Sequence, residues 1–323
     1  MSGGGNSARA VVAALLANLG IAVAKLVGFA ITGSASMLAE SIHSVADSGN
    51  QCLLLLGGRR ARREADASHP FGYGRERYFW GFIVALVLFT LGGAFAILEG
   101  IEKIRHPHEV TSPMVAVVIL LMAVGLETYS FRTAITEARK LKGTASWWQF
   151  VKRSKNPELP VVLLEDFGAE IGLVIALTAL TATLVTGNGV FDGIGTLAIG
   201  GLLSGLAIVL ATEMKSLLLG ETASPEVQEL IRFAIDDEPV VERLIHLRTE
   251  HLGPDELLVG AKVAFRESLT MAELAGAVNR VEARVRQRVP AARFLYIEPD
   301  VVGHDLPEDP LTPGAPRAHE EDE

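Results

Sequence analysis

The sequence predicts a membrane-embedded bundle of six helices followed by a small soluble α+β domain. Of its 323 residues, 49% are hydrophobic, and the mean hydropathy of +0.33 is high for a soluble protein of this length. The apolar residues are concentrated in windows of about twenty residues, the length that a helix needs to cross a bilayer. After residue 220 the composition changes to that of a soluble domain. These three observations define the fold class.

The six apolar windows lie near residues 10–31, 35–57, 79–101, 113–131, 161–186 and 190–219. No small-residue cleavage site follows a short apolar stretch at the N-terminus, so the first window is predicted to be a permanent span and not a signal peptide. The sixth window carries glycines that permit close helix packing, in either a sliding or a static contact. These glycines are Gly193, Gly195, Gly200, Gly201 and Gly205.

The distribution of basic residues predicts the orientation of the spans. The connections 58–78 and 132–160 hold clusters of Lys and Arg, the turns 32–34 and 187–189 hold none, and the loop after the third window holds only Lys103 and Arg105. Under the positive-inside rule both basic connections are cytoplasmic. An even number of spans then places both termini in the cytoplasm. No organelle address is visible, so we expect the plasma (inner) membrane of a bacterium.

The chain after the last window reads as a small soluble domain with the element order αββαβ. Ser224 and Pro225 are a typical helix start. The expected elements are a helix to residue 236, strands at 243–250 and 256–265, a helix at 270–289 and a strand at 293–298. This order suggests helices on one face of a sheet. The predicted organisation is therefore a cytoplasmic N-terminus (1–9), a membrane domain (10–220), a soluble domain (221–302) and a disordered, acidic, Pro-rich tail (303–323).

Cysteine content and charge exclude several classes of protein. The single cysteine, Cys52, excludes an intrachain disulfide framework, a Cys-based zinc ribbon and an iron–sulfur cluster held within one chain. We expect Cys52 to be a buried, inert thiol. The net charge of −9 argues against nucleic acid as a partner. No prosthetic group and no soluble enzyme are expected.

Two pairs of polar residues lie inside apolar windows, where charged side chains are costly and usually functional. His43 and Asp47 are four residues apart in the second window, and Asp166 and Glu170 repeat this spacing in the fifth. Each spacing places both side chains on one helical face. One imidazole and three carboxylates suit a divalent site for zinc, and the oxygen donors also suit manganese or iron. The alternative is a hydrogen bond that holds two helices together, and two matching pairs favour the metal site.

Three other residues near these pairs have open roles. Glu165 precedes Asp166 but points about 100° away around the helix, so we expect it outside the ligand set. An alternative register that includes Glu165 stays open. Asn18 and Asn50 are equally expected as donors to the site or as plain helix contacts.

The segment Gly33–Asn50 (GSASMLAESIHSVADSGN) resembles the second-span signature of the cation diffusion facilitators. The segment Asp66–Arg75 is similar to the family's motif after the second span, and 98–101 and 247–249 also fit. The resemblance covers residues 10–302. It implies a metal(II)/proton antiporter with six spans, a cytoplasmic ferredoxin-like domain and, usually, a homodimeric assembly.

The resemblance also implies a transport site, with two ligands from the second span and two from the fifth. In this chain they are His43, Asp47, Asp166 and Glu170. Zinc-transporting members typically read His-x-x-x-Asp in the fifth span, where this chain reads Asp-Phe-Gly-Ala-Glu. Replacing an imidazole by a carboxylate makes the donor set harder. Zinc is therefore the first expected cargo, and manganese or iron the second.

A second metal site is implied in the loop after the second span. Asp66 and His69 stand at the first two ligand positions, but Tyr73 occupies the third, where the family has histidine. A neutral phenol is a poor zinc ligand, so a weak site is expected. A capped loop start is an equally good interpretation of these residues.

A third site is implied in the cytoplasmic domain. Its candidate residues are His246, His251, Glu298 and Asp300. Lys262 and Tyr296 stand where relatives place further histidines, so we expect this domain to serve dimer contact more than metal binding.

The expected function is that of a secondary transporter that exports a divalent cation from the cytoplasm in exchange for protons by alternating access. Metal binding must expel protons from the ligands, so metal and protons compete for the same groups. Its partners are the metal ion, protons, the lipid bilayer and a second copy of the chain. The alternative is a membrane metal sensor or scaffold, which would bind metal without flux. An intramembrane hydrolase lacks support, because neither His-Glu-x-x-His nor Gly-x-Ser-x-Gly is present.

Overall fold

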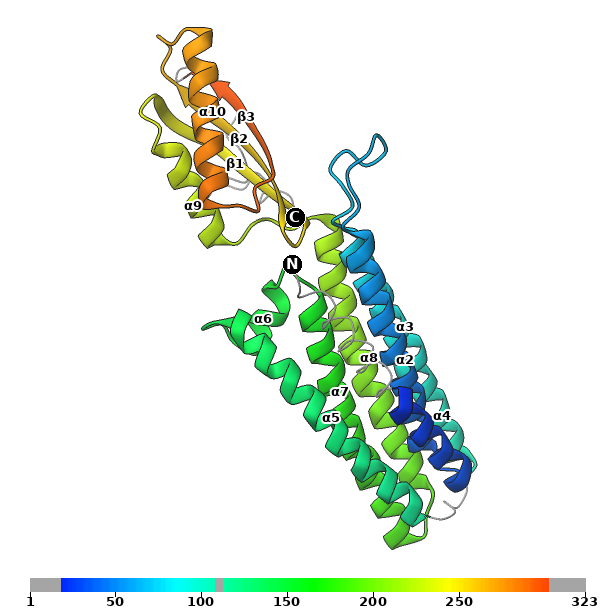
Figure 1. Ribbon diagram of the computed structural model, residues 1–323. Coiled ribbons are helices and arrows are strands. Elements are labelled where there is room, and N and C mark those ends of the chain that lie inside the picture. The colour runs from blue at the N-terminus through cyan, green and yellow to red at the C-terminus, as the bar shows by residue number, and fades with distance from the viewer. Residues whose placement is uncertain (1–18, 108–112, 302–323) are drawn as a thin grey trace, which may run out of the picture. The chain divides into compact units, whose positions relative to one another are not determined.

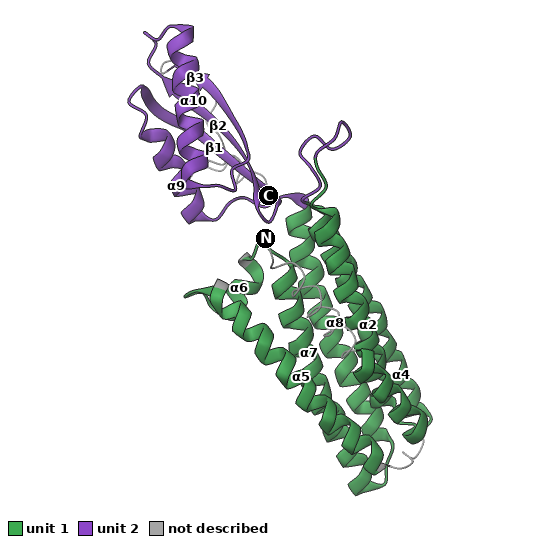
Figure 2. Ribbon diagram, in the orientation of Figure 1, with its two compact units in different colours: residues 1–64, 75–218 green, residues 65–74, 219–323 purple. Residues whose placement is uncertain are grey.

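The computed structural model describes residues 19–107 and 113–301, in two compact units (Figures 1 and 2). The helical unit comprises residues 1–64 and 75–218, and the sheet unit comprises residues 65–74 and 219–323. The loop at 65–74 therefore belongs to the sheet unit although its neighbours in sequence belong to the helical unit. The expected N-terminal segment, Asn18 and the tail 303–323 lie outside the described residues.

The helical unit begins, within the described part of the chain, with the short apolar helix Leu19–Thr32. It continues with α2 (Ala35–Arg60), α3 (Glu76–Val87), the π-helix η1 (Leu88–Ala94), α4 (Phe95–Arg105), α5 (Pro113–Lys142), α6 (Trp147–Arg153), α7 (Glu158–Thr186) and α8 (Val190–Leu219). Among the described residues, four segments are long and apolar enough to cross a membrane: Glu76–Arg105, Met114–Lys140, Glu158–Thr186 and Val190–Leu219. With 26 residues, α2 is about 39 Å long at 1.5 Å per residue, but it carries more polar side chains than these four.

Three expectations about the helical unit are corrected. Lys103 is not in a loop: it lies in α4 and is only 4% exposed. The connection 132–160 is partly helical, because α5 runs on to Lys142 and Ser146 starts α6 through a capping box with Gln149. Cys52 is exposed on α2 and is not a buried thiol.

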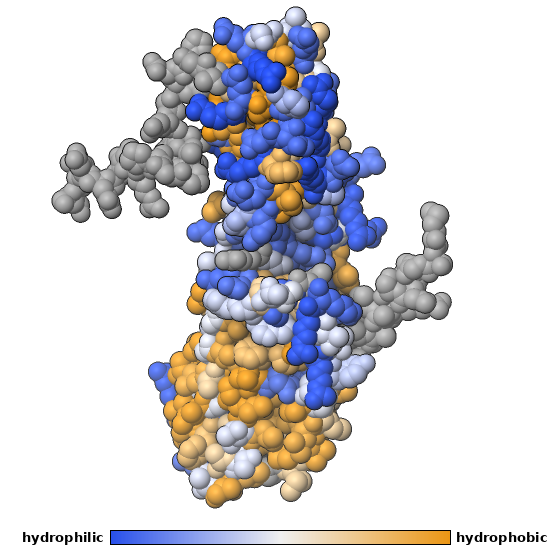
Figure 3. All heavy atoms as spheres, turned by 90° about the vertical axis from the view of Figure 1, so that its left-hand side faces the viewer, coloured by the Kyte–Doolittle hydropathy of each residue, from blue (hydrophilic) through white to orange (hydrophobic). Residues whose placement is uncertain are grey.

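The surface of the helical unit is apolar over a wide area, which Figure 3 shows on one face. Large hydrophobic side chains such as Leu98, Met114 and Val185 are 68%, 70% and 83% exposed. A soluble monomer rarely exposes so broad an apolar surface. Together with the four long apolar helices, this surface identifies the chain as an integral membrane protein.

Glycines bring the segment Glu76–Arg105 and α8 into backbone contact. A Cβ atom at Gly200 would lie 2.9 Å from the carbonyl oxygen of Gly93, and one at Gly193 would lie 3.1 Å from that of Gly100. Each span thus contributes two glycines seven residues apart to the same close approach. This is the close packing expected of the sixth window. Gly201, by contrast, has nothing within 4 Å of its Cβ position.

The sheet unit contains α9 (Pro225–Asp236), β1 (Val241–Gly253), β2 (Glu256–Phe265), α10 (Met271–Arg288) and β3 (Phe294–Asp300). The expected αββαβ order is confirmed. Its sheet has the order β1-β2-β3, with β1 and β2 antiparallel and β2 and β3 parallel. Because β2 and β3 are parallel, α10 crosses over one face of the sheet. The core between helices and sheet includes Ile231, Val259, Val263, Val281 and Val285.

Candidate metal site

His43 and Asp47 form the α2 half of the predicted site. Their side chains are 1% and 15% exposed, and His43 Nδ1 lies 3.4 Å from Asp47 Oδ1. Within residues 19–107 and 113–301, neither ring nitrogen of His43 nor this oxygen of Asp47 has a hydrogen-bond partner. Two donors that share a tetrahedral zinc ion at bond lengths of about 2.0–2.1 Å are separated by about 3.3–3.4 Å. The pair therefore has the spacing of two ligands to one ion.

Asp166 and Glu170 form the α7 half, and α5 orients one oxygen of each. The Ser130 hydroxyl donates to Asp166 Oδ2 at 3.0 Å, and the Thr128 hydroxyl donates to Glu170 Oε1 at 2.8 Å. Glu170 Oε2 is buried without a partner. Buried polar atoms without partners are rare and often mark functional sites. The hydroxyls therefore act as orienting groups that leave an oxygen of Glu170 free to bind an ion.

Two contacts define how α2 and α7 pass each other. Asn50 Nδ2 donates to Glu165 Oε1 at 2.7 Å. Ten residues earlier on α2, Glu40 Oε1 lies 2.5 Å from the position that a Cβ at Gly172 would occupy. Because α2 residue numbers fall while α7 numbers rise between these contacts, the two helices are antiparallel.

This register brings the two predicted ligand pairs to the same depth in the bundle. Interpolation between the two contacts places Asp47 level with Asp166. One turn further, it places His43 level with Glu170. Across residues 19–107 and 113–301, however, no three His, Cys, Asp or Glu side chains are close enough to hold one metal ion. The four predicted ligands are thus aligned along two helices but are not closed around one point.

A cavity of about 620 Å³ between α2, α5 and α7 reaches Asp166. Its lining runs along α2 from Gln51 to Arg59 and on to Arg62 just after the helix, towards the end that carries the basic connection. Its walls are largely apolar, and the charged or hydroxyl residues in its lining are Arg59, Arg62, Ser130, Thr133, Glu137, Glu158 and Asp166. The cavity gives a cation a path from this end of the bundle to the α7 half of the site.

Glu165 was expected outside the ligand set because it points about 100° away from Asp166 around the helix, and the structure places it against α2. It is 4% exposed, and its bond to Asn50 places it at the α2–α7 contact. It also interacts electrostatically with Asp47. Asp166 turns to α5 instead, so adjacent acids on α7 face two different neighbours. Of the two roles left open for Asn50, the structure shows a donor to a carboxylate beside the site.

Three charged residues beside the site escaped the sequence reasoning. Lys25 is fully buried and donates to Glu40 Oε2 at 3.1 Å and to the Ser44 hydroxyl at 2.8 Å. Its Nζ also lies 4.0 Å from Glu127 Oε1. Lys25 lies in the first apolar window, and neither it nor the two glutamates received a role from the sequence. Because a charged side chain inside a span is costly, the presence of these three residues in the sequence was a signal that they serve a function.

In the loop of the sheet unit, Asp66 is committed to local hydrogen bonds. Its Oδ1 accepts from the backbone N–H groups of Ser68 and His69, both at 2.9 Å, and its Oδ2 accepts from the Tyr73 hydroxyl at 2.6 Å. The Tyr73 hydroxyl, followed by the backbone donors, holds the pKa of Asp66 below its usual value. His69 stacks on Tyr73 at a ring separation of 4.3 Å. This geometry is that of a capped loop start, one of the two interpretations left open.

The candidate residues of the sheet unit do not come together around one point. In the sheet register Lys262 lies between His246 on β1 and Glu298 on β3. Its ammonium donates to Glu298 at 2.9 Å and lies 3.2 Å from Asp300, and these bonds raise the pKa of Lys262. His251 is 9% exposed, and its Nδ1 lies 3.4 Å from the carbonyl oxygen of Gly253. The Lys262 ammonium thus lies at the position among these candidate residues where a metal ion would be expected.

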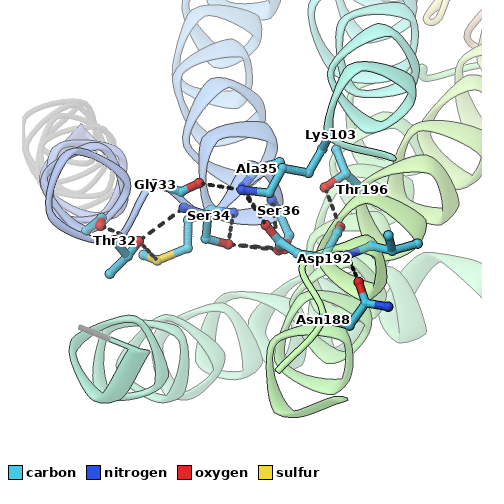
Figure 4. A network of polar contacts seen from close by, with 12 residues as sticks. Thr32, Gly33, Ser34, Ala35, Ser36, Lys103, Asn188, Asp192 and Thr196 are labelled. Carbon is cyan, nitrogen blue, oxygen red and sulfur yellow. Dashed lines mark hydrogen bonds and ion pairs between the residues drawn. The ribbon is translucent and has the colours of Figure 1, made fainter. Parts of the chain in front are cut away.

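A polar cluster at the start of α2, shown in Figure 4, was also missed. Asp192 of α8 is fully buried, and its carboxylate accepts from the Ser34 hydroxyl at 2.9 Å, the Ala35 N–H at 2.7 Å and the Ser36 hydroxyl. Lys103 of α4 lies 4.0 Å from this carboxylate and donates to the Gly33 carbonyl at 3.1 Å. A carboxylate at a helix N-terminus is favoured by the helix dipole. The cluster fastens the first turn of α2, the helix that carries His43 and Asp47, to α4 and α8.

The sequence was compared with known protein families and proteins. Residues 11–219 match the family model described as the cation efflux transmembrane domain. A Xenopus laevis protein named proton-coupled zinc antiporter SLC30A9, mitochondrial, is 33% identical over 244 residues. That match covers 75% of this chain and 44% of the relative, so the chain spans less than half of the relative's length.

Two further relatives come from a plant and a bacterium. Metal tolerance protein C4 of Arabidopsis thaliana is 30% identical over 270 residues, which cover 82% of this chain and 59% of that protein. Zinc transporter ZitB of Escherichia coli (strain K12) is 26% identical over 253 residues, which cover 77% of this chain and 74% of that protein. All three names describe proteins that handle metal ions.

Proposed function

The chain belongs to the cation efflux family, and from this premise we propose that it exports a divalent metal cation in exchange for protons by alternating access. Members of this family are transporters and not enzymes. The metal ion is the cargo of the reaction and not a resident cofactor. The proposed cargo is zinc first, with manganese or iron second.

The observation that carries the proposal is the set of buried, unpartnered donor atoms on α2 and α7. In the described part of the chain, no hydrogen-bond partner is present for either nitrogen of His43, one oxygen of Asp47 or one oxygen of Glu170. The cavity between α2, α5 and α7 supplies access to the fourth member, Asp166. We assign the cation to these four residues, with the cavity as its path from the cytoplasm.

Alternating access follows from the arrangement of α2 relative to the α5–α7 pair. The ligand pairs stand at the same depth but are not closed around one point within the described residues. A small approach of α7 to α2 would bring the four donors together and narrow the cavity. Proton exchange follows because His43 and the three carboxylates bind metal only when deprotonated, so each ion that binds displaces protons.

The donor set supports the proposed order of metals. One imidazole and three carboxylates contain only one nitrogen donor, and oxygen donors favour harder cations than nitrogen or sulfur donors do. We therefore expect zinc transport with measurable manganese or iron transport. The replacement Asp166→His should shift the preference towards zinc, because it restores a second imidazole.

The test is metal uptake into proteoliposomes under a pH gradient, with Zn²⁺, Mn²⁺ and Fe²⁺ supplied separately. Asp47→Asn and Asp166→Asn should each lower flux by more than the roughly 10- to 100-fold typical of losing an orienting group, because each removes one charged ligand. Glu137→Gln is the matched control, since Glu137 is an acid that lines the same cavity without belonging to the ligand set. It should transport at nearly the rate of the unmodified protein.

Glu165→Gln separates the two adjacent acids of α7. The glutamine retains an oxygen that accepts the hydrogen bond from Asn50, so flux should fall much less than in Asp166→Asn. If the two variants are equally inactive, Glu165 belongs to the ligand set and the assignment must be revised. If the unmodified protein binds metal but moves no ion, the sensor or scaffold replaces the transporter.

We further propose six membrane spans, formed by the helix that contains Leu19–Thr32, by α2, by the α3–η1–α4 run, and by α5, α7 and α8. Both termini then lie in the cytoplasm, the membrane is the plasma membrane of a bacterium, and the assembly is a homodimer. The basic connections after α2 and α5 support this orientation. In a Cys52→Ser background, a membrane-impermeant thiol reagent should label Ser154→Cys from the cytoplasmic side and Asn188→Cys from the opposite side.

A further inference from the structure

The fully buried ammonium of Lys25 lies between two carboxylates inside the helical unit. It donates to Glu40 Oε2 at 3.1 Å and to the Ser44 hydroxyl at 2.8 Å, and it lies 4.0 Å from Glu127 Oε1. The side chains of Lys25 and Glu40 are 0% exposed, and that of Glu127 is 12% exposed. The 4.0 Å separation is too long for a hydrogen bond. One cation is thus shared by two acids and is bonded closely to only one of them.

The second oxygen of Glu40 has no partner among the residues that the structure describes. Glu40 Oε1 is buried and makes no hydrogen bond to any of them, and it points at the face of α7 where Gly172 leaves room for it. A purely structural ion pair would be expected to satisfy both oxygens, because an unpaired charged oxygen in an apolar interior is costly. The free oxygen indicates that Glu40 is placed to accept a further cation.

Glu40 lies one helical turn from the proposed transport site. It precedes His43 by three residues, and it shares a face of α2 with His43 and Asp47 because i, i+3 and i+7 positions align on a helix. In the proposed orientation the N-terminus of α2 is the end away from the cytoplasm. A cation that leaves His43 and Asp47 towards that end therefore meets Glu40 next.

We propose that Glu40 provides a second divalent-cation subsite on the release side of the transport site, that Lys25 is the tethered cation that holds this subsite until metal displaces it, and that Glu127 receives the displaced ammonium. This inference rests on the proposed function. The Lys25 ammonium and the incoming ion compete for the same oxygens. When metal engages Glu40, the ammonium moves towards Glu127, and its return expels the ion. Lys25 thereby prevents metal from being trapped on the exit path.

The proposal predicts that loss of Lys25 creates a retained metal ion. Equilibrium dialysis of the full-length, detergent-solubilised protein against Zn²⁺ alone should show about one more ion per chain for Lys25→Met than for the unmodified protein. The double variant Lys25→Met/Glu40→Gln should return to the unmodified value. Lys103→Met is the matched control, because Lys103 is also a buried lysine near a carboxylate but lies away from this subsite. It should leave the number of bound ions unchanged.

A second variant keeps the proposal testable if Lys25→Met does not fold. Glu127→Gln leaves the Lys25–Glu40 bond intact but removes the carboxylate that receives the displaced ammonium. Its maximal rate of zinc uptake should fall at least tenfold, while the number of ions bound at equilibrium stays unchanged. Uptake at the unmodified rate would overturn the proposal. So would a Lys25→Met protein that binds the same number of ions as the unmodified protein.

The binding experiment also separates this inference from the proposed transport function. In a His43→Ala/Asp47→Ala background the transport site is disabled, yet Lys25→Met should still add one zinc ion. If the unmodified protein shows no flux but the added ion appears, the transport proposal fails and the subsite stands. If flux is normal but no ion is added, the subsite fails and the transport proposal stands.

Discussion

The replacement Asp192→Ala tests how firmly the start of α2 is fastened to α4 and α8. Asp192 accepts hydrogen bonds from the Ser34 hydroxyl, the Ala35 N–H and the Ser36 hydroxyl, and it faces the Lys103 ammonium at 4.0 Å. Removing one partner of a buried charged cluster typically costs about 3–5 kcal/mol, because the remaining polar groups stay buried. At about 2–4 °C per kcal/mol for a unit of this size, the unfolding midpoint should fall by about 6–20 °C.

Thermal unfolding of the detergent-solubilised protein measures this effect, and two further variants identify its source. Asp192→Asn keeps acceptor atoms but loses the charge, so its cost should be smaller, about 1.5–3 kcal/mol. Lys103→Met should cost less in the Asp192→Ala background than alone, by about 0.5–3 kcal/mol, if the two charges are coupled. A midpoint shift below about 3 °C for Asp192→Ala, or equal costs of Lys103→Met in both backgrounds, would refute the reasoning.

Three further predictions concern the site, the helix packing and the sheet unit. Thr128→Val removes the hydroxyl that orients an α7 carboxylate, so zinc affinity in a binding titration should fall about 10- to 100-fold. Thr133→Val is the control: the Thr133 hydroxyl bonds to its own helix, so this variant should bind zinc normally. Gly200→Ala should cost about 1–3 kcal/mol in thermal unfolding because of backbone contact, while Gly201→Ala should be neutral. In the sheet unit, arginine partners hold the pKa of Glu238 below its usual value. The stabilising contribution of Glu238 is therefore complete above about pH 4.5 and is lost as the pH falls through the lowered pKa. Glu238→Gln should remove this part of the acid sensitivity in a pH series of unfolding midpoints.

The elements of the sheet unit were predictable because their signals are local. Ser224 caps α9 and Pro225 stands in its first turn, as expected, and the strand expected at 256–265 has the observed bounds of β2. The pairing of β3 with β2 was not predicted, since strand order depends on contacts between residues far apart in the sequence. The crossover by α10 decides that pairing.

In the helical unit, hydropathy located the long apolar segments. It did not locate irregular helical turns or the contacts that one helix makes with another. The π-helix η1 lies where Gly92 and Gly93 contact α8. Because a hydropathy average does not depend on contacts between helices, it does not predict this feature. Lys103 was assigned to a loop because a lysine near the end of an apolar window reads as a boundary. Its partner Asp192 is almost ninety residues away in the sequence, so only the folded chain shows that the lysine is buried.

The helix spacing of four identified which residues share a face, but it did not identify the neighbour that each face meets. α7 lies against both α2 and α5: Glu165 bonds to Asn50 of α2, while Asp166 bonds to Ser130 of α5. Two adjacent residues 100° apart therefore serve two different interfaces, which a single helical wheel cannot separate. The same fact bears on mechanism. In the proposed transport cycle, metal binding would draw Asp166 from α5 towards Asp47 on α2, whereas Glu165 already lies at that contact and would hold α2 and α7 in register while the other carboxylates move.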